Sequence, residues 1–255
     1  MTEENGDAIS SPKKPSDEIT SITKDVDSSV SKLVSEKLKD TGMVDYRENP
    51  MYTAEEVDAI GYYQDHGHAQ HKYDCEIPKD EIHVDCYITN GILRHEDFKA
   101  KLSPEDLVMN ITEVYTPIKD AMKKSTIKSD VVVFKGLDNG QWFLDEYQPI
   151  LNKEGIAEFR DKGFESTSLS FKSANRYTTA RKYTTNISGV KQEGEFVKVF
   201  LRIYVKKGHN AIYLKEDDEF LLDTNFIGVI TDCTIYNKGE LIGDAKAILY
   251  TIIEQ

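Results

Sequence analysis

The sequence predicts an α+β fold in which a helical N-terminal lobe packs on two mostly antiparallel β-sheets. Apolar residues recur at helical spacing in segments up to residue 128, and from residue 129 onward they alternate with polar residues in several short runs. Helices followed by strands are typical of α+β domains. We therefore expect a disordered tail with a short helix at residues 1–45, a helical lobe at 46–128 and a β-rich core at 129–255.

The tail differs in composition from the rest of the chain. Residues 1–17 are rich in Ser, Pro, Glu, Asp and Lys, which is typical of disordered segments. From Ile19 to Leu38, apolar residues recur at helical spacing, but the pattern is too short for a stable coiled coil. It favours a short amphipathic helix packed on the main body, with a coiled-coil or partner-binding helix as the alternative.

Two helices are expected in the lobe, and each has a recognisable first turn. Thr53 and Glu56 have the spacing of a capping box, in which each side chain binds the other residue's backbone N–H. Ser103 followed by Pro104 is typical of a second helix start. The apolar face of this second helix consists of Leu107, Ile111, Val114, Ile118 and Met122.

Beyond the lobe, short apolar or alternating runs favour β-strands. Strands are expected at 131–134, 196–205, 211–214, 219–222, 226–236 and 245–253. One or two helices are expected between the first two of these strands. They would lie around 152–162, where Gly163 would end the helix, and around 173–183.

Composition and charge exclude several classes of protein. The formal net charge of −13 is unsuited to binding nucleic-acid phosphates, so protein or small-molecule partners are expected. No apolar run approaches the roughly 18 residues of a membrane span, and the N-terminus lacks the apolar stretch of a signal peptide. Cys75, Cys86 and Cys233 lack CxxC spacing and are expected as reduced thiols. These features predict a cytoplasmic protein with no membrane or nucleic-acid partner.

A cluster of histidines and cysteines follows the first helix of the lobe. Its members are His66, His68, His71, Cys75, His83 and Cys86. The cluster could hold zinc, but no CxxC or HxxxH pair provides standard ligand spacing. A polar loop is therefore favoured, and no metal is expected.

The sequence has none of the common catalytic or nucleotide-binding signatures GxxxxGK, GxGxxG, HExxH and GxSxG. Three short stretches remain as candidates for a functional site. They are FKGL at 134–137, GFESTS at 163–168 and DDEFLL at 217–222. Each alone also fits a structural role: a strand ending in a turn glycine, a polar edge strand and a solvated acidic turn. Their order along the chain favours a common site.

In this order the three stretches resemble the mono-ADP-ribosyltransferases of the arginine-modifying type, which include actin-modifying binary toxins and enzymes of tailed phages. The family pattern is an Arg-Gly pair ending the first core strand, a Ser-Thr-Ser strand after a Gly-aromatic approach, and a Glu-x-Glu pair before an apolar strand. The matching residues are Lys135-Gly136, Ser166-Thr167-Ser168 after Gly163-Phe164, and Asp217-Asp218-Glu219. YTAEEVDAIGYYQDHGH and ITNGILR upstream resemble the family's helical lobe, so the resemblance covers roughly residues 50–255.

The resemblance implies an activity and three catalytic residues. NAD would be split, nicotinamide would leave, and ADP-ribose would pass to a protein side chain, with NAD as co-substrate and no metal. Glu219 would face the oxocarbenium-like transition state, and Ser166 would orient its carboxylate. Asp217 would orient or deprotonate the acceptor, and an acidic residue at this position implies arginine as that acceptor.

The resemblance also implies how NAD is held. Lys135 would bind the phosphates, and the backbone of Gly136 would bind the nicotinamide amide, because a residue without Cβ permits close approach. The remaining candidates are Ser166, Thr167 and Ser168 on the polar strand and Arg176, Tyr177 and Arg181 in the segment 171–183. Trp142 could also line the cleft, but a core position is favoured for a lone Trp. Two positions depart from the family pattern: Lys135 replaces Arg and so lacks its bidentate fork, and Asp217 replaces Glu and is one methylene shorter.

Two alternatives to a transferase stay open at this point. One is an NAD glycohydrolase that uses the same pocket with water as acceptor. The other is a catalytically weak or dead relative that binds a partner protein. For the transferase, the expected partners are NAD and a protein of the host, such as RNA polymerase or another cytosolic protein. The acidic chain suits a phage enzyme inside an infected bacterium better than a complete secreted toxin.

Overall fold

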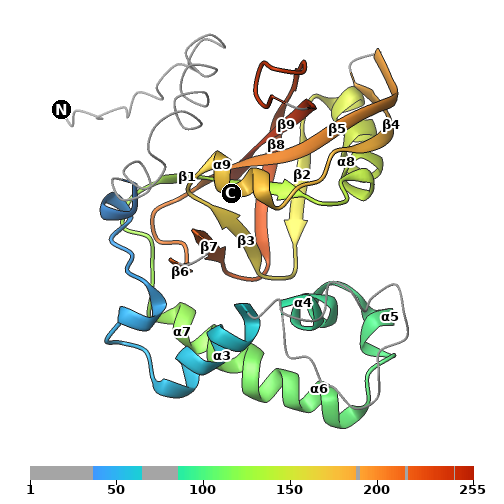
Figure 1. Cartoon of the computed structure of the whole chain (residues 1–255). Coiled ribbons are helices and arrows are strands. Elements are labelled where there is room, and N and C mark those ends of the chain that lie inside the picture. Colours follow the sequence, from blue (N-terminus) through green and yellow to red (C-terminus); the bar gives the residue numbers. More distant parts are fainter. Residues whose placement is uncertain (1–36, 65–85, 188–189, 216–217, 244) are drawn as a thin grey trace, which may run out of the picture.

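The computed structural model describes residues 37–64, 86–187, 190–215, 218–243 and 245–255. Its helical elements are η1 (Tyr46–Glu48), α3 (Ala54–Gln64), α4 (Cys86–Arg94), α5 (Glu96–Lys99), α6 (Pro104–Asn110), η2 (Ile111–Tyr115), α7 (Thr116–Lys123), α8 (Gln141–Glu154) and α9 (Phe171–Arg176). Its strands are β1 (Val131–Leu137), β2 (Ala157–Asp161), β3 (Glu165–Ser168), β4 (Arg181–Ile187), β5 (Val190–Val205), β6 (Ala211–Leu214), β7 (Glu219–Leu222), β8 (Phe226–Tyr236) and β9 (Lys246–Glu254). In Figure 1, α3 to α7 gather below one end of the strands, and α8 and α9 lie beside them.

The described strands follow one hydrogen-bonded path in the order β2-β8-β9-β5-β1-β3-β7-β6, and β4 pairs with β5. Among the strand pairs of the described residues, only β5 and β9 run parallel, so the α+β class and the mostly antiparallel pairing are confirmed. The expected two sheets are instead joined. The junction is narrow, because β1 and β3 share a single pair, Phe134 opposite Ser168. Beyond that pair the two strands diverge.

Apolar side chains cover both faces of the sheet. On one face Val197, Val199, Leu201, Ile203 and Val205 of β5 all enter the largest apolar cluster, which also contains α8. The alternation predicted for this strand is therefore correct. On the other face, α9 packs on β1 and β3, and its apolar side chains form a second cluster with neighbouring strands. The divergence of β1 and β3 thus lies next to α9.

The helical lobe packs through a third apolar cluster, which joins α3 and α7 to β6 and β7. The capping box is present at the start of α3: Thr53 N donates to Glu56 Oε2 over 2.8 Å, and Glu56 N donates to Thr53 Oγ1 over 3.2 Å. Phe164, at the approach to β3, is completely buried in this cluster. The lobe therefore contacts the segment that carries the Ser-Thr-Ser strand.

The second predicted helix begins as expected, since Ser103 Oγ accepts from Asp106 N and Pro104 follows. It continues through the π-helical turn η2 into α7. A π turn adds one residue and rotates the following face. Val114, Ile118 and Met122 are buried as predicted, whereas Ile111 is 38% exposed because it precedes the rotation.

One predicted helix is wrong and another is shortened. Residues 157–161 form β2 and not a helix, because α8 already ends at Gly155, which adopts a left-handed φ of 77°. In β2, buried and exposed residues alternate with the period of a strand. The helix expected around 173–183 is α9, which ends at Arg176, and β4 begins at Arg181.

Several predictions concern residues that the structure does not describe. The helix expected from Ile19 to Leu38 lies almost entirely outside the described residues, as do the candidate metal ligands between His66 and His83. Among the described residues, no group of three or more His, Cys, Asp or Glu side chains could hold a metal ion. Within the same residues, no helix has the length and apolar character to cross a bilayer.

Candidate active site

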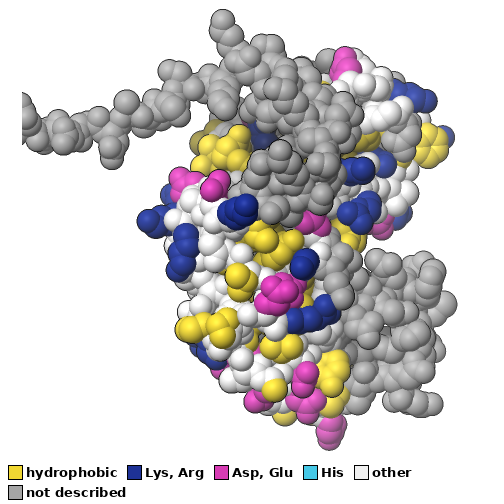
Figure 2. Space-filling view, turned by 60° about the vertical axis from the view of Figure 1, so that its left-hand side comes forward, with side chains coloured by type: hydrophobic (Ala, Val, Ile, Leu, Met, Phe, Trp, Pro, Cys, Tyr) yellow, Lys and Arg dark blue, Asp and Glu magenta, His cyan; other side chains and the backbone are white. Residues whose placement is uncertain are grey.

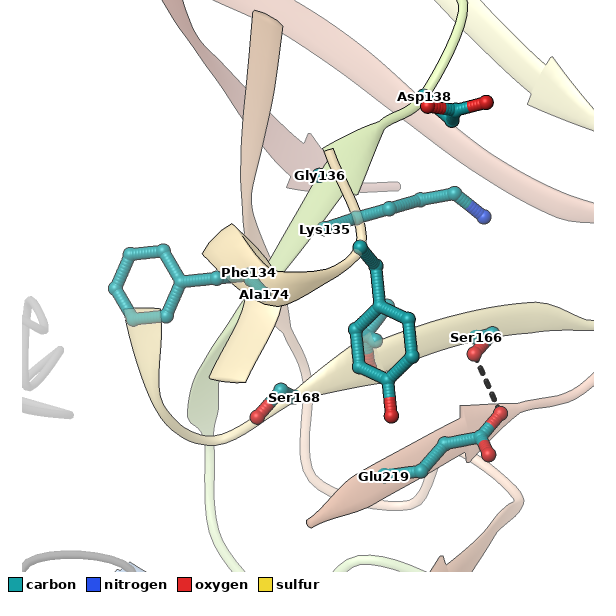
Figure 3. Close-up of a pocket in the computed structure, with 10 residues that line it drawn as sticks. Phe134, Lys135, Gly136, Asp138, Ser166, Ser168, Ala174 and Glu219 are labelled. Carbon is teal, nitrogen blue, oxygen red and sulfur yellow. Dashed lines mark hydrogen bonds between the residues drawn. The ribbon is translucent and has the colours of Figure 1, made fainter. Parts of the chain in front are cut away.

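A pocket of about 220 Å³ opens where β1 and β3 diverge. Its walls come from the end of β1, from β3, from the start of β7 and from α9 with the residue after it. The lining residues are Phe134, Lys135, Gly136, Asp138, Ser166, Thr167, Ser168, Ala174, Tyr177 and Glu219. Figure 3 shows the residues that line this pocket, with Ser166 and Glu219 facing each other on neighbouring strands. Seven of the sequence-predicted site residues thus line one pocket: Lys135, Gly136, Ser166, Thr167, Ser168, Tyr177 and Glu219.

Glu219 and Ser166 face each other across two neighbouring strands. Glu219 begins β7 opposite Ser168, so Ser166 is its diagonal neighbour on the same face of the sheet. Ser166 Oγ donates a 2.5 Å hydrogen bond to Glu219 Oε1, drawn as the dashed line in Figure 3. Glu219 is only 6% exposed, although it lines the pocket. A carboxylate with one oxygen fixed in this way can present a defined negative charge to a bound ligand.

Lys135 lines the pocket, and its side chain also belongs to a buried cluster of charged side chains. Its Nζ lies 2.5 Å from Glu165 Oε2, and Glu165 is 1% exposed. Arg94, at the end of α4, donates through Nε to Asp161 Oδ1 over 2.7 Å and through Nη2 to Oδ2 over 2.8 Å. Arg94 Nη2 also lies 3.9 Å from Glu165 Oε1. We call Lys135, Glu165, Arg94 and Asp161 the ion cluster.

The two carboxyl groups of the ion cluster have opposite pKa shifts. Burial raises the pKa of Glu165 to about 8; Lys135 acts in the opposite direction, and Asp161 adds to the rise. For Asp161, burial also acts to raise the pKa, but hydrogen bonding to Glu165 and the charge of Arg94 outweigh it and lower the pKa to about 2. At neutral pH, Asp161 is therefore ionised and Glu165 is mostly protonated.

Gly136 is the point at which α9 approaches β1. A Cβ at this position would lie 2.4 Å from the carbonyl oxygen of Ala174 and 2.9 Å from Cβ of Thr178. The missing side chain thus makes room for α9, and the backbone of Gly136 still lines the pocket. The close approach that we expected for a ligand is, in this structure, made by the protein's own helix.

We expect Gly136→Ala to lower the free energy of unfolding by about 2 kcal/mol, because backbone and not a flexible side chain blocks the added methyl group. The matched control is Gly243→Ala, where an added Cβ would meet nothing within 4 Å. Urea denaturation measures both variants. A Gly136→Ala protein as stable as the control would show that α9 moves away at no cost.

The hydroxyl groups of Thr167 and Ser168 are used within the fold. Thr167 Oγ1 donates to the carbonyl oxygen of Phe220 over 2.5 Å, and Ser168 Oγ accepts from Ser170 N over 3.1 Å. Both residues are nearly buried. They support the β3–β7 pair and the turn into α9, which hold Ser166 in place.

The basic and aromatic candidates of the 171–183 segment take different positions. Tyr177 lines the pocket and is 44% exposed. Arg176 and Arg181 are absent from its lining. Arg181 binds Asp138, a lining residue, through the carbonyl oxygen over 2.7 Å and the carboxylate over 2.9 Å. Trp142, in the first turn of α8, also lies outside the lining and is 49% exposed.

The acidic stretch before β7 is described only in part. Asp217 lies outside the described residues. Asp218 adopts a left-handed φ of 56°, and its Oδ2 accepts from Ser173 Oγ of α9 over 2.8 Å. Arg176 Nη2 donates to the same hydroxyl over 3.0 Å. Asp218 is therefore a contact between this stretch and α9.

Charged side chains of both signs are mixed on the described part of one face of the molecule (Figure 2). On the face shown in Figure 2, dark-blue Lys and Arg side chains alternate with magenta Asp and Glu side chains, and yellow hydrophobic side chains lie between them. The described residues of this face form no continuous basic stripe of the kind that nucleic-acid-binding proteins carry.

No family model and no curated protein matches the sequence significantly. Solved structures do match. The C3 exoenzyme of Clostridium limosum has a TM-score of 0.53 at 17% identity, over 89% of this chain and 94% of that chain. For Plx2a, an ADP-ribosyltransferase toxin from Paenibacillus larvae, the TM-score is 0.52 at 18% identity, over 88% and 96%.

The chain has the ADP-ribosyltransferase fold. BECa, an ADP-ribosylating toxin of a binary enterotoxin of C. perfringens solved with NADH, matches it with a TM-score of 0.51 at 20% identity. That match covers 89% of this chain but 48% of BECa, so the chain spans about half of that toxin's length. The resemblance inferred from three short stretches is therefore confirmed at the level of the fold.

Sequence reasoning missed part of what surrounds the pocket of this ADP-ribosyltransferase fold. Phe134, Asp138 and Ala174 line the pocket but were not predicted as site residues. Glu165 was missed although it directly precedes Ser166. Its signal was a single acidic residue at the start of a strand whose other residues carry hydroxyl groups, since a buried charge requires a partner.

Proposed function

We propose that the protein is a mono-ADP-ribosyltransferase that moves ADP-ribose from NAD to a protein side chain, with arginine as acceptor and nicotinamide as leaving group. One observation supports this above all: Glu219, held by Ser166, faces a pocket at the point where β1 and β3 diverge. The ADP-ribosyltransferase fold around the pocket supports the same reaction. The Glu219 carboxylate is the group that would act on the ribose.

The chemistry requires a fixed negative charge beside the ribose. When the bond between the nicotinamide nitrogen and ribose C1′ breaks, its electron pair leaves with nicotinamide and C1′ gains positive charge. The Glu219 carboxylate would stabilise that charge, and the hydrogen bond from Ser166 would limit its reorganisation. The acceptor nitrogen then bonds to C1′ and loses a proton.

The pocket would hold the nicotinamide end of NAD. At about 220 Å³ it is smaller than the roughly 300–1,000 Å³ of sites that enclose a whole ligand. The remainder of NAD would extend beyond it, and Lys135 would supply positive charge for the phosphates. Thr167, Ser168, Arg176, Tyr177 and Arg181 stay proposed contacts for NAD.

The residue that would act on the acceptor, Asp217, is proposed from its position in the sequence. Asp217 lies two residues before Glu219 and would orient or deprotonate the guanidinium of the acceptor arginine. We propose that the target is a protein of the host and that the reaction takes place in its cytoplasm.

Incubation with NAD tests the proposed function directly. The purified protein should release nicotinamide from NAD, and with labelled NAD and a bacterial lysate it should label a small set of proteins. Mass spectrometry of those proteins should place ADP-ribose on arginine. If the protein neither labels any protein nor releases nicotinamide, the proposed function is wrong.

We expect Asp217→Ala to lower protein labelling by at least about tenfold while nicotinamide release changes little, because the proposed role of Asp217 concerns only the acceptor. Asp232→Ala is a suitable control, since Asp232 is an exposed carboxylate on β8. Equal loss of labelling and release would assign Asp217 to NAD cleavage. Release without labelling in the unaltered protein would indicate an NAD glycohydrolase.

A further inference from the structure

The ion cluster brings a buried carboxyl group to the wall of the pocket. Lys135 lines the pocket, and its Nζ binds Glu165, which is almost completely buried. Strand alternation directs Lys135 and Glu165 to the opposite side of the sheet from Ser166. Because β1 and β3 diverge here, Lys135 still borders the space in which a ligand would lie.

The cluster carries an uncompensated positive charge at neutral pH. Arg94 and Asp161 form a two-pronged ion pair, so their charges compensate each other. Glu165 is mostly protonated at neutral pH because burial raises its pKa to about 8. The ammonium group of Lys135 is therefore bound to a largely neutral partner, and its charge acts on the pocket.

We propose that Glu165 controls the affinity for NAD by deciding whether the positive charge of Lys135 is compensated. This inference rests on the proposed function, because it takes the pyrophosphate of NAD as the anion that Lys135 attracts. When Glu165 loses its proton, its carboxylate neutralises Lys135 over 2.5 Å and weakens that attraction. Glu165 is thus a positioning residue that acts through Lys135 and not on the reacting atoms.

The other ionisable groups around the cluster leave this assignment intact. The pKa of Asp161 is lowered to about 2, far below the range concerned, and Arg94 stays charged. Tyr63 of α3, whose hydroxyl accepts from Asn90 Nδ2, stays neutral because burial raises its pKa well above the usual value. Asp138 and Glu219 are the two residues with carboxyl side chains that line the pocket.

We expect the dissociation constant for NAD to rise about tenfold between roughly pH 7 and pH 9, since one charge–charge attraction is lost and NAD itself titrates no group there. Binding is measured by calorimetry on the full chain with Glu219→Gln, so that NAD is not consumed. In that background, Glu165→Gln should keep the pH 7 affinity within about twofold, because glutamine resembles the protonated acid, and should abolish the pH dependence. Glu158→Gln, an exposed carboxylate on β2, should behave like the parent.

Three outcomes would overturn the inference: an unchanged affinity in the parent from pH 7 to pH 9, a pH dependence that persists in Glu165→Gln, or a pH dependence that disappears in Glu158→Gln.

A second measurement needs no Glu165 variant. Calorimetry near pH 8 in two buffers of different ionisation enthalpy should show that NAD binding takes up protons, and no uptake would contradict the proposal. Absence of NAD binding at every pH would refute the proposed function as well, whereas binding without pH dependence would refute this inference alone.

Discussion

Glu219→Gln is expected to lower the rate of nicotinamide release on the order of 10³-fold. Glutamine keeps the size of the side chain and can still accept from Ser166, but it removes the negative charge that would stabilise the oxocarbenium-like transition state. The KM for NAD should change much less, because that charge matters chiefly in the transition state. Steady-state kinetics with quantified nicotinamide measures both parameters.

Two variants make the Glu219 experiment specific. Ser166→Ala should lower the rate by only about tenfold, since the carboxylate stays charged but loses the hydroxyl that orients it. Glu158→Gln should leave the rate unchanged, because Glu158 is an exposed residue paired with Arg160. A Glu219→Gln protein that is folded and keeps more than about a tenth of the rate would contradict the proposed role.

Arg94→Ala is expected to lower the free energy of unfolding by about 3 kcal/mol. The substitution removes both hydrogen bonds to Asp161 and a third to the carbonyl oxygen of Phe164, over 3.1 Å. The side chain of Asp161 is 10% exposed, so its charge would be left largely buried and without its main partner. Urea denaturation followed by circular dichroism measures the loss.

Arg160→Ala is the matched control for Arg94→Ala. Arg160 also pairs with a carboxylate, Glu158, but its side chain is 63% exposed. Water can replace this pair, so the free energy of unfolding should stay close to that of the parent. If Arg94→Ala were no more destabilising than Arg160→Ala, the Arg94–Asp161 pair would not hold α4 to the end of β2.

Structural features that depend on residues close together in the sequence were predictable. The strands at 211–214, 219–222 and 226–236 have the predicted bounds, because polar and apolar runs there are delimited by turn residues. The capping box at Thr53 was predictable for the same reason: its two hydrogen bonds join residues three positions apart. The spacing of residues in the sequence is enough to predict an element or a hydrogen bond when the residues that form it are close together in the chain.

Predictions failed where two local signals competed. The helix expected around 152–162 was predicted to end at Gly163, but Gly155 comes earlier in the chain and can also end a helix. In the structure Gly155 ends α8, and its N–H donates to the carbonyl oxygen of Leu151. Residues 157–161 then pair with β8, a partner about 70 residues away, and such pairing outweighs local helical preference.

The fold class, the order of the three motifs and most residues of the pocket could be predicted from the sequence. These depend on strand periodicity and on short motifs, in which the informative residues are close together in the chain. The tertiary structure alone decided which side chains surround Lys135. Arg94, Asp161 and Glu165 come from α4, β2 and β3, and only packing of the helical lobe against the strands brings them together. A buried carboxyl group that controls the charge of Lys135 is therefore a property of the fold and not of any single motif.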